Sequence, residues 1–264
     1  MQFEFSQRWR SRRTSFRPPG EVIDTRAYEV APLVGDAAAK AFIIEHHYSG
    51  TYPAARFRFG LFRAGVLQGV AVFSHPCNDA VLTSVFPGAP TESVELGRFV
   101  LLQDVAFNGE SWFIARAFHH LRREGLRGVV SFADPLPRRG ADGTVTTPGH
   151  VGQIYQAENG VYLGRSTPRT LHLLPDGSTF SARAAQKIRR GERGWRYAVE
   201  QLVSAGAPEP TGDLGPWLKV ALTALTTVRH PGNHRYAWAF ARSERRSLSS
   251  RHSPYPRAAF LPLT

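Results

Sequence analysis

Cysteine and lysine are scarce in this chain of 264 residues. Cys77 stands alone, which excludes an internal disulfide and a thiolate metal cluster. Lysine occurs only at Lys40, Lys187 and Lys219, so arginine carries almost all of the net charge of +12. A GC-rich genome explains arginine in place of lysine, but it does not explain why 33 basic residues outnumber 21 acidic ones. Because a planar guanidinium suits phosphate, we favour a nucleic acid as the partner.

Long hydrophobic runs are also missing. No run approaches the ~18 residues that a membrane span needs, and the arginine-rich N-terminal segment lacks the apolar stretch of a secretory signal. We therefore expect a cytoplasmic protein without a membrane partner. The chain also lacks a glycine-rich strand–turn–helix unit with an acidic residue about 20 positions later, which argues against a site for S-adenosylmethionine or a dinucleotide.

The segment from residue 93 to 164 organises the chain, because it reads as strand, helix and strand. Asn108 is a favourable N-cap for the helix. A unit of this length predicts a right-handed parallel crossover, and ligands in such sheets bind beyond the carboxyl ends of the strands. We therefore expect the turn at 108–111 and Asp134 beside one crevice. The three elements are expected at 94–102, 111–124 and 129–133.

The order of elements predicts the fold class. From residue 28 a strand, a helix and a hairpin precede the central unit, and a short helix and a strand follow it. This is the order of the GNAT-type N-acetyltransferases, so we predict an α/β (α+β) fold with a GNAT-like mixed central sheet flanked by helices. The expected division is a basic aromatic arm at 1–27, a catalytic core at 28–180 and a basic helical and strand extension at 181–264.

Outside the core the expectations are coarser. They are loops at 76–90 and 136–147, a helix capped by Ser181 with basic side chains up to Arg196, a helix at 217–228, a strand at 234–241 and an irregular tail at 242–257.

Two basic segments are candidates for contact with a phosphate backbone. The arm interleaves aromatic side chains with arginines and is read either as a nucleic-acid-binding arm or as a loose terminus. Its arginines are Arg8, Arg10, Arg12, Arg13 and Arg17. The helix after Ser181 supplies the side chains that we assign to the DNA backbone, which are Arg183, Lys187, Arg189, Arg190 and Arg193.

Two groups at the ends of elements are candidates for catalysis. Asp134 ends a buried strand, where a carboxylate can accept a proton from a substrate amine or hydrogen-bond a base edge. The alternative is that Asp134 with Pro135 simply ends the strand. His47 and Tyr48 follow a helix, where they can act as base, metal ligand, acid or stacking platform, and capping of the helix is the alternative.

Glu95 and Arg98 lie on the central strand, and their spacing of three predicts opposite faces. A guanidinium in a strand built for burial requires an anion, which is either a carboxylate of the chain or a substrate or cofactor phosphate. Tyr155, Asn159 and Tyr162 follow Asp134 and can line a pocket for a base, while a half-buried core position is the alternative for the tyrosines.

The turn before the central helix is a candidate cofactor site. Asn108 and Gly109 can present helix N–H groups to a cofactor phosphate, and Ser111 begins the helix proper. The acetyltransferase signature Arg/Gln-x-x-Gly-x-Gly/Ala is reduced here to Gly109. Neighbouring histidines on a helix point in different directions, so no metal site is assigned.

Taken together, several motifs resemble the Mom family of phage DNA-modification proteins over roughly residues 28–175. They are His47-Tyr48-Ser49-Gly50, the hairpin segments 59–62 and 69–73, Glu95-Leu96-x-Arg98, the helix start at Ser111, Ala133-Asp134-Pro135 and Gly152-x-Ile154-Tyr155-Gln156-Ala157-x-Asn159-x-x-Tyr162-x-Gly164.

The resemblance implies a GNAT-like fold and the addition of a carbamoylmethyl group to adenine N6 in DNA, which shields phage DNA from restriction. It places functional residues at His47, Tyr48, Arg98, Ser111 and Asp134. An acetyl-CoA-like donor and an iron requirement have both been suggested for the family, so the cofactor is left open.

Two further functions remain as alternatives. A GNAT-type N-acetyltransferase acting on a small-molecule or protein amine would bind coenzyme A and need no DNA. A non-catalytic DNA-binding protein would keep its affinity without the candidate catalytic residues.

Overall fold

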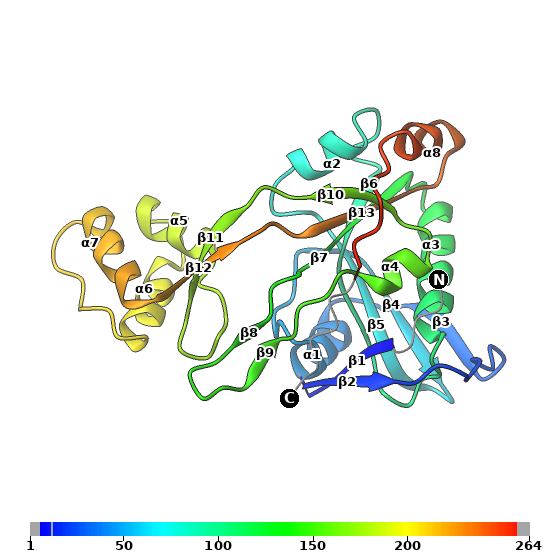
Figure 1. The fold of residues 1–264 in the computed structure, drawn as a ribbon, viewed down its shortest axis with the longest axis horizontal. Coiled ribbons are helices and arrows are strands. Elements are labelled where there is room, and N and C mark those ends of the chain that lie inside the picture. Colours follow the sequence, from blue (N-terminus) through cyan, green and yellow to red (C-terminus); the bar gives the residue numbers. More distant parts are fainter. Residues whose placement is uncertain (1–5, 12, 258–264) are drawn as a thin grey trace. The chain divides into compact units, whose positions relative to one another are not determined.

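The fold was analysed in a computed structural model that describes residues 6–11 and 13–257 (Figure 1). Contacts divide the chain into two compact units. The first contains the residues up to Pro135, Gly149–Ser166 and those from Asn233 onward, and the second contains Leu136–Pro148 and Thr167–Gly232. This division differs from the expected boundaries at 27 and 180, because the second unit is inserted into the first at two places.

A seven-stranded mixed sheet forms the centre of the first unit (Figure 1). The strands from β3 to β6 are antiparallel neighbours, β6 and β7 are parallel, and β13 is antiparallel to both β7 and β10. In spatial order they are β10 (Val161–Arg165), β13 (His234–Ala239), β7 (Gly128–Ala133), β6 (Ser93–Leu101), β5 (Val66–Ser74), β4 (Ala55–Arg63) and β3 (Tyr28–Pro32).

Helices cover both faces of this sheet. Helix α3 (Gly109–Arg123) packs its apolar stripe on one face, where it forms the largest core with β4, β5, β6, β7 and β13. Helix α1 (Ala37–His46) covers β5 and β6 on the other face. On that second face α2 (Ala80–Val85) and α8 (Arg242–Ser249) cover β7, β10 and β13. The short helix α4 (Gln153–Ala157) precedes β10. The predicted mixed sheet flanked by helices is confirmed.

The N-terminal arm contains a β-hairpin. β1 (Ser6–Arg10) pairs antiparallel with β2 (Arg13–Arg17), and Arg8 is buried. Residues 1–5, Arg12 and residues 258–264 of the expected arm and extension lie outside the described part of the chain.

The second unit has a core of its own. Helices α5 (Ala182–Arg190), α6 (Trp195–Ser204) and α7 (Leu214–Ala221) pack together around Ile188, Leu202 and Leu218. A 3₁₀ turn, η1 (Leu222–Ala224), follows α7. The unit also contains two antiparallel pairs, β8 (Arg138–Arg139) with β9 (Val145–Thr147) and β11 (Arg169–Leu173) with β12 (Thr226–His230).

Several outer elements differ from the expectations. The expected loop at 76–90 contains α2, the loop at 136–147 contains the β8–β9 pair, and the tail at 242–257 begins with α8, which buries Leu248. The helix after Ser181 is two helices, because Gly191 and Gly194 adopt positive φ values of 63° and 85°.

The helix expected at 217–228 ends earlier. Thr226, Thr227 and Val228 are β-branched and pair with β11 instead of continuing the helix. Within the described residues, no helix is long and apolar enough to cross a membrane.

Candidate active site

A β-bulge in β6 determines which side chains share a face. The register of β6 against β5 shifts between Leu96 and Arg98, so Gly97 has no partner in β5. A Cβ atom at position 97 would lie 2.6 Å from Oγ of Ser74, so glycine alone fits without a shift. The extra residue resets the alternation of side chains. Glu95 and Arg98 therefore lie on the same face of the sheet, and the prediction of opposite faces is wrong.

That face is the one covered by α1. Arg98 lies opposite Val72, and Val72 and Val100 pack with Ile43 of α1. The chain after α1 returns over the same strands, and Tyr48 packs against this cluster. The bulge thus directs Glu95 and Arg98 toward the carboxyl end of α1.

Beside the bulge the two parallel strands separate. β6 pairs with β7 only as far as Leu96 and Ser131, although β6 continues to Leu101. The Ser131 hydroxyl donates to the Leu96 carbonyl at 3.0 Å and forms a hydrogen bond with the Tyr155 hydroxyl. Tyr155 belongs to the core on the opposite face. The gap between the strands therefore brings side chains from both faces of the sheet together.

Burial raises the pKa of Tyr155 to about 12, with smaller contributions from charges across the gap. These charges belong to Tyr48, Glu95 and Arg98. Tyr155 thus interacts electrostatically with the groups on the α1 face.

Arg98 is held by the loop that follows α1. Its Nε donates to the Thr51 carbonyl at 2.9 Å, and its Nη2 donates to Thr51 Oγ1 at 2.7 Å. Its Nη1 donates to the Gly97 carbonyl at 2.5 Å. The hydrogen bonds of the Arg98 guanidinium thus go to neutral oxygens, and the Glu95 carboxyl interacts with it electrostatically.

His47 and Tyr48 are ordered by the end of α1. His47 is the C-cap residue, and its amide donates to the Ile43 carbonyl at 3.0 Å. Its ring is buried, with Nδ1 2.9 Å from Ser49 Oγ. The ring also stacks on Tyr48, with a centroid separation of 4.3 Å. The capping role considered for this histidine is met by its main chain, while its ring faces the site.

Asp134 and His150 complete the cluster at the end of β7. Asp134 directly follows the strand and is half-buried. Its main-chain carbonyl accepts a hydrogen bond from the His150 amide at 2.8 Å. The His150 ring lies edge-on to Tyr48, with the centroids 6.5 Å apart. His150 also interacts electrostatically with Asp134 and His47. The cluster therefore runs from the bulge to the rim of the sheet.

Burial sets the protonation states in this cluster. It raises the pKa of Glu95 to about 7, and the positive charge of Arg98 opposes that rise. Burial lowers the pKa of His47 well below its usual value, and Arg98 and His150 lower it further. Burial also lowers the pKa of His150 to about 4, against the attraction of Asp134. At neutral pH the site combines two neutral imidazoles with a guanidinium and a carboxyl near its titration midpoint, which suits proton transfer from a bound amine.

Other residues predicted for the site lie elsewhere in the first unit. Ser111 forms a hydrogen bond with Glu158. Asn159 lines a cavity of about 390 Å³ beside Trp238 and Phe240. Tyr162 lies nearer the cluster, because its hydroxyl is 2.8 Å from Nδ1 of His234, and His234 interacts electrostatically with His150.

A comparison with protein families identifies the chain. The model of the Mom protein family matches residues 28–257. The chain belongs to the Mom protein family. The match extends beyond the resemblance read at residues 28–175 and includes all of the second unit as well as β13 and α8.

Two acetyltransferases are similar solved structures. One is a Bacillus subtilis acetyltransferase in complex with CoA, with a TM-score of 0.34 and 8% identity over 81% of this chain and 98% of that one. The other is a tandem GNAT protein from the clavulanic acid biosynthesis pathway, with a TM-score of 0.42 and 11% identity over 80% and 98% of the two chains. No curated protein matches this chain.

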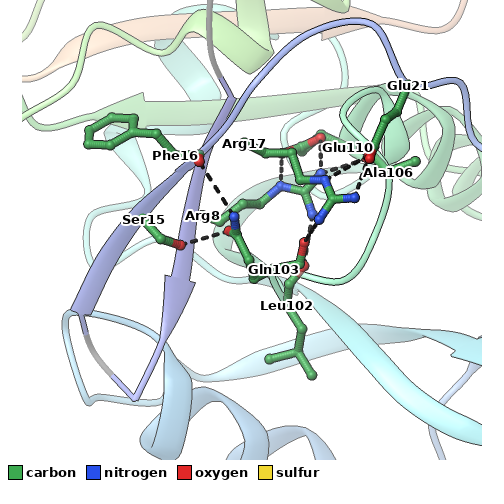
Figure 2. A network of polar contacts seen from close by, with 9 residues as sticks. All are labelled: Arg8, Ser15, Phe16, Arg17, Glu21, Leu102, Gln103, Ala106 and Glu110. Carbon is green, nitrogen blue, oxygen red and sulfur yellow. Dashed lines mark hydrogen bonds and ion pairs between the residues drawn. The ribbon is translucent and has the colours of Figure 1, made fainter.

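In this Mom family member the side chain of Arg8, from the N-terminal hairpin, lies against the start of α3 (Figure 2). The Arg8 guanidinium lies 2.5 Å from Glu110, in the first turn of α3, and donates to the carbonyls of Leu102 and Ala106 at 2.8 and 2.7 Å. The side-chain oxygen of Asn108 accepts a hydrogen bond from the main-chain amide of Ile23 at 2.8 Å.

These contacts test the predicted cofactor site. Gly109 faces inward, because a Cβ there would lie 2.4 Å from Val105. The buried ion pair of Arg8 and Glu110 occupies the first turn of α3, and Glu110 already balances the charge of Arg8 there. The residues at the start of α3 therefore do not fit the diphosphate of coenzyme A.

The described residues also form no group of ligands suited to a resident metal ion. Among the described residues, no three His, Cys, Asp or Glu side chains form a group that could hold an ion. The residues present do not fit an iron site of the usual composition.

The sequence interpretation missed Glu95 and His150 as members of the site. Glu95 was noted only as a neighbour of Arg98, because strict alternation separated the two. His150 follows the first inserted segment of the second unit, so its spacing in sequence does not indicate that it returns to β7. The glycines at positions 149 and 152, which have φ values of 72° and 79°, were the available signal of a tight return.

Proposed function

We propose that this Mom family member is a transferase that modifies adenine at N6 in DNA with a carbamoylmethyl-type group and so protects the DNA from restriction. Membership of the family carries the proposal. The gathering of His47, Tyr48, Arg98 and Asp134 around the gap between β6 and β7 supports it.

The chemistry of the acceptor suits this cluster. The N6 amine of adenine is a weak nucleophile, because its lone pair is delocalised into the ring. Asp134 at the rim accepts a hydrogen bond from the amine and orients it. The base leaves the helical stack to reach the site, at a cost of a few kcal/mol, and stacking on Tyr48 offsets part of that cost.

The basic face of α5 is proposed to hold the duplex. Arg183 and Arg189 of α5 and Arg193, which follows the helix, are exposed, and Arg183 also lies 2.6 Å from Glu192. Contacts of guanidinium with phosphate are insensitive to base sequence and weaken as salt rises. We assign the donor only by its chemistry, as a molecule with an electrophilic carbon and a leaving group, and a diphosphate bound at the start of α3 is no part of the proposal.

Mass spectrometry of nucleosides from the DNA of expressing cells tests this function. The expected result is an adenine nucleoside carrying the added mass of a carbamoylmethyl group. Asp134→Asn is expected to abolish that product while duplex affinity stays within about twofold, because the rim carboxylate acts on the base. Asp104→Asn, at an exposed position of the same unit, is the matched control.

Two outcomes contradict the proposal. Unmodified DNA, together with thermal protection of the protein by coenzyme A alone, would favour an acetyltransferase of another amine. Duplex binding that persists without any altered nucleoside would favour a non-catalytic DNA-binding protein.

A further inference from the structure

We propose that Glu95, rather than Asp134, accepts the proton that the acceptor amine loses during transfer. The inference rests on the proposed function and assigns the proton-accepting group of the same site. It follows from the bulge at Gly97, which turns a carboxylate of the central strand toward the α1 end of the site.

The surroundings of Glu95 are those of a base and not of a structural ion pair. Within the described part of the chain, no side chain donates a hydrogen bond to its carboxylate. The nearby guanidinium of Arg98 is bound to Thr51 and Gly97 instead. Structural carboxylates in a protein interior normally accept hydrogen bonds. The half-buried Glu95 carboxylate lacks such a donor and has free lone pairs for a substrate proton.

The other carboxylate of the site is placed differently. Asp134 follows the last residue of β7 and is half-buried, so it lies at the rim. Glu95 lies opposite Val130 in the paired part of the two strands, inside the sheet. The two carboxylates thus occupy the outer and inner ends of the cluster, which suits one for orientation and the other for proton transfer.

The charges around Glu95 adjust its strength as a base. Arg98 faces it from the same strand, Tyr155 faces it from α4, and Ser74 is its neighbour on β5. His47 and Tyr48 approach Arg98 and Tyr155 from the end of α1. Burial outweighs Arg98 and leaves the pKa of Glu95 at about 7. A base of this pKa is half-ionised at neutral pH, where general-base catalysis is most effective.

The step balances in atoms and charge. The lone pair of N6 forms a bond with the electrophilic carbon of the donor, and the bond from that carbon to its leaving group breaks. The leaving group departs with the electron pair. One of the two N6 protons passes to the Glu95 carboxylate, directly or through one water, and the other stays on the product.

The test is the pH dependence of single-turnover modification of a duplex by the full chain. The wild-type rate is expected to rise about tenfold per unit below pH 7 and to level off above it. In Glu95→Gln the rate at pH 8 should fall at least about 100-fold, and the rise of the rate with pH (the rising limb) should disappear. The affinity of this variant for the duplex should stay within twofold of the wild type. Glu29→Gln, at an exposed position of β3, should behave as the wild type.

The outcomes separate this inference from the proposed function. If the wild type modifies no adenine, the proposed function fails. If the wild type modifies adenine and Glu95→Gln keeps both its rate and the rising limb, only the assignment of Glu95 fails. Should Glu95→Gln show no cooperative unfolding, Glu95→Asp replaces it. If Glu95→Asp keeps the rise of the rate with pH but reaches a lower maximum rate, the assignment is supported. A rate equal to that of the wild type would overturn it.

Discussion

A half-buried, poorly solvated carboxyl such as that of Glu95 carries a cost in stability. Its pKa in the folded chain is about 7, compared with 4.5 for a glutamate side chain in water. The folded state therefore binds more protons than the unfolded state between these two pH values. Stability falls as pH rises through this window and levels off above it, by about 3 kcal/mol in all.

Replacing the carboxyl with a neutral amide should remove this loss. Glu95→Gln is expected to be more stable than the wild type by up to about 3 kcal/mol at pH 8 and close to it at pH 4, where Glu95 is protonated in both states. Urea unfolding at both pH values measures the difference. A difference that does not change with pH would contradict the environment described for Glu95. A variant that gains stability and loses activity is the usual sign of a strained functional group.

At the scale of elements, the site depends on one irregularity in β6. The bulge at Gly97 places Glu95 and Arg98 on one face. Bulges occur where a strand must redirect a side chain, and they are set by packing against the neighbouring strand. Here the neighbour is Ser74, whose hydroxyl fills the space that a side chain at 97 would need.

This close approach can be tested with a pair of variants. Gly97→Ala should destabilise the chain by about 1–3 kcal/mol, because its Cβ would meet Ser74 Oγ at 2.6 Å. Adding Ser74→Ala should recover most of the loss, since the Ser74 Cβ would be 3.7 Å away. Ser74→Ala alone serves as the control. Equal losses for Gly97→Ala in both backgrounds, measured by thermal unfolding, would rule out this contact as the reason for glycine.

The regular elements of the core could be predicted from the sequence, and the irregular ones could not. The stripe of Ile114, Ala117, Phe118 and Leu121 indicated α3 because it follows the helical period. The bulge carries no such signal, since glycine in a strand is consistent with several structures. The short helix α2 and the arginine-rich α8 were missed because tertiary contacts of Leu82 and Leu248 stabilise them, not local propensity.

At the scale of the whole molecule, the basic charge was predictable from composition but its partition was not. The positions of α5 look equivalent in sequence. In the folded second unit Glu192 pairs with Arg183, whereas among the described residues Arg189 forms no ion pair. Contributions to DNA binding should therefore differ between these arginines.

The salt dependence of duplex binding measures that difference. Arg189→Gln should lower the slope of log affinity against log salt by about 0.9, the value for one phosphate contact in B-form DNA. Arg183→Gln should lower it less, because Glu192 already neutralises that guanidinium. Both variants should keep the same relative affinity for different duplex sequences. Equal slopes for the wild type and Arg189→Gln would remove α5 from the interface.

The insertion of one unit within the other has a consequence for synthesis on the ribosome. β13 lies between β7 and β10 in the sheet, yet it is made after Thr167–Gly232. At a synthesis rate of ~5–20 residues per second, the inserted segment takes roughly 3–13 s to make. During that time the nascent first unit lacks β13. Its exposed strand edges are then open to mispairing. Pairing of β13 with β7 and β10 therefore completes the sheet only after residues 167–232 have been synthesised.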